Sequence, residues 1–179
     1  MNGRQMMDSH RAVSRSCSIT QTEWTIERSY AAFTAAFEAL LGRMEADAFG
    51  DLPSLSPEGA RARLASVVGP LDFVLFQRID HGAIVTSLYR QDAHAMTYVF
   101  GNALIAVEMT KHDLRAGLHV PLRLMVEQVA QGRVRVTYDL PSSLIARLGV
   151  PAADVVARDL DLKVERLLAA TIQRAQAPA

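Results

Sequence analysis

Asp80 and His81 stand side by side in the sequence, a pair that could supply acid–base chemistry. Histidine titrates near neutral pH, and an adjacent carboxylate can orient its imidazole as a general base. Residues 79–83 have the composition of a tight hairpin turn in which Gly82 takes a positive φ. Aspartate and histidine are also common in turns for local reasons, and no nucleophile is visible beside them. An enzyme with His81 as its base is therefore one hypothesis, and the sequence leaves open whether the chain is an enzyme.

A second group of polar residues lies at the ends of two expected strands and at the helix start that follows. Arg123 could bind a carboxylate or a phosphate through two parallel N–H donors. Ser142 and the nearby helix start could add hydroxyl and backbone donors, beside Tyr138 and Asp139. The alternative is an Arg123–Asp139 pair that fixes the end of a strand, with Asp139 capping the next helix. If the chain has a ligand site, we expect it at these residues.

Asn102 follows Gly101 where a strand is expected to lead into a helix. An asparagine at such a junction commonly caps the helix, and this role explains the residue without a ligand. The glycine and lysine spacing of nucleotide-binding loops is absent, so no phosphate loop is predicted. The candidate ligand-binding residues are His81, Asn102, Arg123, Tyr138, Asp139 and Ser142.

Glu108 and His112 lie four residues apart, with Asp113 and His119 after them, a set that could suggest a metal. The HExxH arrangement that places two histidines and a glutamate on one helix is missing, so no metal site is predicted. Cys17 is the single cysteine, which excludes an internal disulfide and a cysteine-based zinc site. No cofactor motif is visible, and no cofactor is expected.

Composition limits the class of protein. The chain has 179 residues, of which 50% are hydrophobic and 21% charged, as expected for a folded domain. The formal net charge of zero argues against a nucleic-acid partner, which needs a basic surplus. No apolar run approaches the about 18 residues of a membrane span, and no secretory leader is visible. We expect no membrane partner, a cytoplasmic location, a single domain at 19–174 and disordered or frayed tails at 1–18 and 175–179.

Apolar periodicity predicts the elements that must position these side chains. Strands are expected at 20–28, 73–76, 84–88, 95–100, 122–129 and 133–138, and helices at 30–44, 57–68, 102–111, 141–148 and 151–174. Helices therefore flank a run of strands at both ends of the chain. This order indicates an α+β class, with a mostly antiparallel sheet of about five to six strands and helices packed on one face in two layers.

The strands at 122–129 and 133–138 form the clearest local signal. A three-residue loop at 130–132, with Gly132 in the left-handed region, places Val126 opposite Val136 and keeps apolar side chains on one face. The same register sets Glu127 opposite Arg135, and Arg123 opposite Asp139, as pairs of opposite charge.

Several short motifs gather between positions 97 and 148. They are Gly101-Asn102, Ala106 and Met109, Ala116-Gly117-Leu118 with Pro121-Leu122-Arg123, and Tyr138-Asp139-Leu140-Pro141-Ser142-Ser143. With Asp80-His81-Gly82 and residues 157–161, this combination resembles the domain of unknown function 302 family over residues 24–170. Ala103 departs from the pattern, since many members have proline there. The resemblance implies a compact α+β domain that often self-associates, and it implies no reaction.

Three functions stay open at this point. The first is a small-molecule binding or sensing module, whose ligand could be anionic and held at Arg123. The alternative is a homodimeric interaction or structural module, which the neutral charge and the apolar stripe of the last helix favour. The third is the enzyme with His81 as general base.

Overall fold

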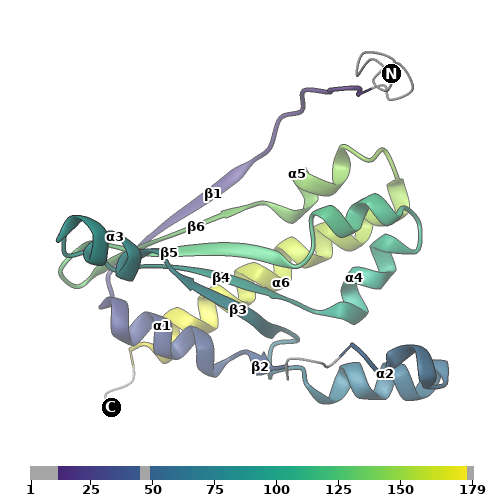
Figure 1. Cartoon of the computed structure of the whole chain (residues 1–179), viewed down its shortest axis with the longest axis horizontal. Coiled ribbons are helices and arrows are strands. Elements are labelled where there is room, and N and C mark those ends of the chain that lie inside the picture. The colour runs from purple at the N-terminus through teal and green to yellow at the C-terminus, as the bar shows by residue number, and fades with distance from the viewer. Residues whose placement is uncertain (1–11, 45–48, 177–179) are drawn as a thin grey trace, which may run out of the picture.

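The computed structural model of the chain describes residues 12–44 and 49–176 (Figure 1). In chain order the elements are β1 (Gln21–Ile26), α1 (Tyr30–Ala39), β2 (Gly42–Arg43), η1 (Leu52–Ser54), α2 (Pro57–Ser66), β3 (Val74–Asp80), α3 (His81–Tyr89), β4 (Ala95–Gly101), α4 (Ala103–Thr110), η2 (Leu114–Leu118), β5 (Leu122–Ala130), β6 (Arg133–Asp139), α5 (Pro141–Ala146) and α6 (Pro151–Arg174). Most of both expected tails, 1–11 and 177–179, lies outside the described residues.

The strands form one six-stranded sheet in the order β1-β6-β5-β4-β3-β2. All neighbouring strands pair antiparallel except β2 and β3, which are parallel. The predicted α+β class with a mostly antiparallel sheet is therefore confirmed. None of the helices in the described ranges has the length and apolarity needed to cross a membrane.

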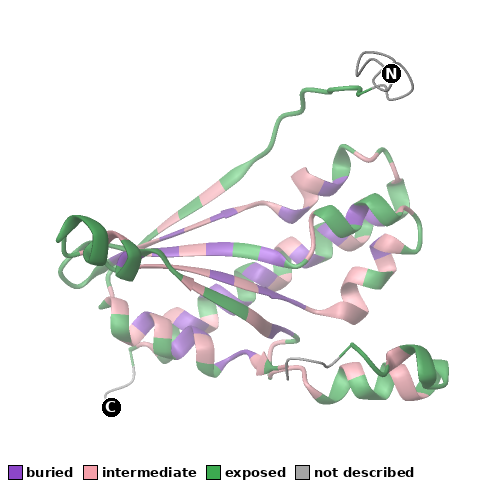
Figure 2. Ribbon diagram, in the orientation of Figure 1, coloured by how far each residue is buried: buried purple, intermediate pink, exposed green. Residues whose placement is uncertain are grey.

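One face of the sheet carries the core, and side chains alternate along the strands accordingly. In β5, Leu122, Leu124 and Val126 are buried, whereas Arg123 between them is exposed. The main apolar helices on the buried face are α1 and α6, and Figure 2 shows buried segments along both. Their largest contributions to the core are Phe33, Phe37, Leu160, Val164, Leu167 and Leu168. On the other side of β5, Arg123 is exposed and Met125 is half-buried.

The hairpin of β5 and β6 has the predicted register. Val126 pairs with Val136, and Glu127 pairs with Arg135, whose Nε donates to the Glu127 carboxylate at 2.7 Å. Gly132 has the expected positive φ of 75°. The extra residue sits differently from the prediction: Ala130 pairs with Arg133, and a bulge between Gln128 and Ala130 absorbs it. The matching apolar faces of the two strands fix the register, and the bulge in β5 accommodates the extra residue.

The prediction of a hairpin turn at 79–83 followed by a strand at 84–88 is wrong. Residues His81–Tyr89 form helix α3, whose N-cap is Asp80: its carboxylate accepts a hydrogen bond from Ala83 N–H at 2.8 Å. Gly82 is helical, and its small size serves another purpose, because a Cβ there would lie 2.4 Å from the Ala93 carbonyl oxygen. The Asp80 cap thus stabilises a helix here, although the β-branched residues of the segment favour a strand.

Candidate functional site

An apolar pocket of about 300 Å³ opens at the end of the sheet where β4 leads into α4. Four residues of α4 line it, Ala103, Ile105, Ala106 and Met109, and Leu160 of α6 contributes from the helical layer. Residues 120–122, at the start of β5, form a further wall. Of the described residues in this lining, Asn102 alone has a polar side chain, so the pocket suits an apolar group.

Small residues leave this space open. Gly101, Ala103 and Ala106 succeed one another where the strand becomes a helix, and larger side chains there would fill the pocket. Two aromatic rings from distant parts of the chain close another side: Phe49 stacks on Phe76 with ring centroids 6.3 Å apart. The pocket is therefore lined by five segments of the described chain that meet only when it is folded.

Asn102 caps α4, as its position after Gly101 predicts. Its Oδ1 accepts a hydrogen bond from Leu104 N–H at 2.8 Å, and its Nδ2 donates to the Asp72 carbonyl at 2.8 Å. The side chain thus ties the start of α4 to the loop before β3. The fold gives Asn102 this capping role, and a ligand contact by Asn102 stays a prediction.

A second hollow lies on the other face of the same sheet end, and we call it the basic depression. It has a volume of about 430 Å³, is open to solvent, and includes the side chains of His119, Arg123, Asp139, Leu144 and Arg147. Ile19 and Val99 also line it. The depression and the apolar pocket share Val120 and Pro121 as lining residues.

His119 lies against Arg147 in this depression. Arg147 donates to His119 Nε2 from Nη2 at 2.8 Å, and its Nη1 lies 3.0 Å from Cys17 Sγ. Burial lowers the pKa of His119, and the positive charges of Arg147 and Arg123 lower it further. An imidazole that accepts from a guanidinium is neutral, so His119 adds no positive charge of its own.

Arg123 and Asp139 both line the basic depression, but they do not form the predicted pair. No ion pair within 4.0 Å joins them in the described part of the chain. Strand β1 explains the difference, because it places Gln21 opposite Asp139 and Gln21 Nε2 donates to the carboxylate at 3.2 Å. The helix cap predicted for Asp139 is absent as well: the N-cap position of α5 is Leu140.

The other candidate residues lie apart from this depression. Tyr138 points into the core, where burial raises the pKa of its phenol. Ser142 N–H donates to the Asp161 carboxylate at 2.9 Å, so this backbone donor at the start of α5 is already bound. His81 begins α3 at the opposite end of the sheet, since Asp80 is level with Met96 and Val126. Of the six candidates, the structure brings only Arg123 and Asp139 into the depression.

Two features of the site escaped the sequence prediction. Arg147 was not singled out, and His119 was considered only as a metal ligand. Among the described residues, no three histidine, cysteine, aspartate or glutamate side chains gather as a metal site would require. The run of small residues at 101, 103 and 106 was the one sequence signal for the apolar pocket.

Comparisons with known proteins give a family and a fold. A family model described as "Domain of unknown function DUF302" matches residues 51–171. No curated protein matches the sequence. The crystal structure of an uncharacterised conserved DUF302 protein from Bacillus stearothermophilus is similar, with a TM-score of 0.56 and 15% sequence identity. The similarity covers 87% of this chain and 98% of that one, and at this identity it supports the fold alone.

Proposed function

The chain belongs to the family of the domain of unknown function DUF302, and from that premise we propose that it binds a small molecule through an apolar group. The single observation that carries the proposal is the apolar pocket of about 300 Å³ beside Gly101. Small-molecule sites are typically concave and mostly apolar with few polar groups, and this pocket has that character.

The volume indicates the size of the bound group. An apolar cavity of about 150 Å³ accommodates benzene, so a pocket of twice that volume suits a group of about ten non-hydrogen atoms. Among the described residues the lining offers no charged side chain, and the polar atoms of Asn102 already bind Leu104 and Asp72. Affinity would therefore come mainly from burial of apolar surface.

Titration calorimetry with 1-octanol tests this proposal. We expect saturable binding to the wild-type chain and at least about tenfold weaker binding to Ala106→Phe, because the added ring fills the pocket. Ala103→Leu is a milder filling variant in case the larger ring disturbs the fold. Ala169→Phe, at an exposed position on α6, is the matched control and should bind 1-octanol normally. Equal binding by all four proteins, or none by the wild type, would contradict the proposal.

A homodimeric interaction module is the second candidate function. What favours it is helix α3, where Ile84, Leu88 and Tyr89 are 52%, 70% and 75% exposed. Neighbouring apolar side chains on one surface helix are typical of interaction sites. Sedimentation equilibrium should then give twice the chain mass at micromolar concentration, and Leu88→Asp should give the monomer. A monomeric wild-type chain would exclude this candidate.

A further inference from the structure

The apolar pocket and the basic depression meet at one segment of chain. Val120 and Pro121 line both hollows, and Leu122 lines the pocket together with a small recess that also includes Arg123. Phe100 near the end of β4 pairs with Leu122, and a Cβ added at the next residue, Gly101, would lie 3.4 Å from Pro121. Residues 120–121 thus lie between the two hollows, and a molecule that occupies both has to pass over them.

The charge on that surface is unbalanced. No ion pair among the described residues includes Arg123 or Arg147. His119 accepts from Arg147, and Asp139 is bound by Gln21. Two guanidinium groups against one carboxylate leave one net positive charge, and guanidinium groups bind carboxylates through charge-assisted hydrogen bonds.

We propose that the ligand is an amphipathic monoanion. Its apolar tail lies in the pocket beside Gly101 and Ala106, and its carboxylate lies in the basic depression between Arg123 and Arg147. This inference rests on the proposed function for the tail and adds the chemistry of the head. A dianion fits less well, because the Asp139 carboxylate lines the same depression.

The length of the ligand follows from the two hollows together. The pocket suits about ten non-hydrogen atoms, so an eight-carbon chain fills most of it. The head must then pass the Pro121 ring to reach the depression, where Cys17 Sγ already lies against Arg147. A short anion such as acetate meets only the arginines and gains nothing from the pocket.

Titration calorimetry with octanoate, 1-octanol and acetate separates the head from the tail. We expect octanoate to bind about tenfold more tightly than 1-octanol, as one charge-assisted hydrogen bond would provide. Arg123→Ala and Arg147→Ala should each remove most of this advantage and leave 1-octanol binding unchanged. Arg123→Lys should retain part of it. Arg174→Ala, at the exposed end of α6, is the matched control and should bind all three probes as the wild type does.

Each other outcome has one meaning. Equal affinity for octanoate and 1-octanol would overturn the anionic head and leave the apolar pocket as proposed. Acetate binding as tight as octanoate would overturn the joint site, because the tail would then contribute nothing. Failure of both eight-carbon probes to bind would overturn the inference together with the proposed function.

Discussion

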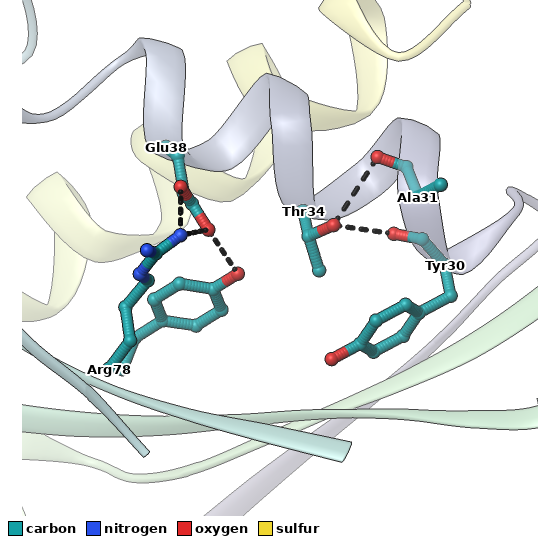
Figure 3. A network of polar contacts seen from close by, with 6 residues as sticks. Tyr30, Ala31, Thr34, Glu38 and Arg78 are labelled. Carbon is teal, nitrogen blue, oxygen red and sulfur yellow. Dashed lines mark hydrogen bonds and ion pairs between the residues drawn. The ribbon is translucent and has the colours of Figure 1, made fainter. Parts of the chain in front are cut away.

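Two polar clusters of this molecule handle charge in opposite ways. Glu38 of α1 is fully engaged, since its carboxylate accepts from Arg78 at 2.9 Å and 3.1 Å and from the Tyr98 hydroxyl at 2.9 Å (Figure 3). Tyr98 is completely buried, and burial together with the Glu38 charge raises the pKa of its phenol, so it stays a donor. In the basic depression, by contrast, Arg123 and Arg147 lie near a neutral His119, and within the described ranges no carboxylate forms an ion pair with either arginine.

The difference suits the first cluster to stabilising the fold and the second to binding another molecule. A buried hydroxyl with a charged acceptor stabilises the fold, and removing its partner leaves a polar group unsatisfied. Cations kept near one another on an open surface contribute nothing comparable to stability and hold charge available for another molecule. We therefore expect substitutions in the first cluster to change stability, and substitutions in the second to change binding.

Glu38→Ala should have the largest effect on stability. The variant leaves the buried Tyr98 hydroxyl without an acceptor and Arg78 without its carboxylate, so we expect a loss of about 2–3 kcal/mol in the free energy of unfolding. Urea denaturation measures it. Glu27→Ala, which removes an exposed pair with Arg133, is the control and should lose less than about 1 kcal/mol. Similar losses for both variants would mean that the contact of Glu38 with the buried Tyr98 adds nothing beyond an exposed ion pair.

Tyr98→Phe should destabilise the chain less. It removes one hydrogen bond but keeps the ring packed against Phe37, whose centroid is 5.0 Å away, so about 1 kcal/mol is expected. The same urea experiment compares it with Glu38→Ala. A loss as large as that of the alanine variant would mean that the hydroxyl, rather than the carboxylate, organises the cluster.

Asp139→Asn tests the second cluster of the comparison, the basic depression. Asp139 is the carboxylate that the described residues contribute to the basic depression. Removing its charge, while an amide still faces Gln21, should tighten octanoate binding by about two- to fivefold. The free energy of unfolding should stay within about 0.5 kcal/mol of wild type. Calorimetry at low and at high salt checks the origin of the gain, because an electrostatic effect shrinks as salt screens it. Weaker octanoate binding by the variant would argue against an anionic head.

The smallest effect concerns pH and His119. Its pKa lies below the ordinary value of 6.5 in the folded chain, so below that value the unfolded chain binds more protons. The contribution of His119 to stability is therefore complete above pH 6.5 and declines as the pH falls through the folded pKa. His119→Gln should lessen the loss of stability between neutral and mildly acidic pH, as thermal unfolding can show. An unchanged pH profile would mean that His119 titrates normally.

Local patterns predicted much of the fold. Alternating faces fixed the pairing of Val126 with Val136, and Ser29 and Asn102 cap the helices expected after them. These features depend on residues that are close in sequence or lie in one hairpin, so the sequence alone is enough to predict them. Helix α3 was missed because Asp80 and Gly82 fit a turn as well as a helix start, and only the approach of Ala93 distinguishes them.

The candidate site was harder to predict, because it depends on contacts between distant segments. Arg147 meets His119 only after α5 and η2 are placed on the sheet, and Phe49 meets Phe76 although η1 and α2 lie between them in the chain. A pocket is also space that side chains leave unfilled, and no sequence motif records which distant segments will surround such a space. Arg123 was found because its residue type and its place at a strand end are both visible in the sequence.

Cys17 gives the molecule a built-in reporter. It is the single cysteine of the chain, it is exposed, and its sulfur touches Arg147 at the rim of the basic depression. A maleimide fluorophore added to the unmodified protein would therefore attach at one position only, beside the proposed head-group site. Its emission would report the arrival of any molecule at Arg147, so a compound library could be screened by fluorescence without engineering a labelling site.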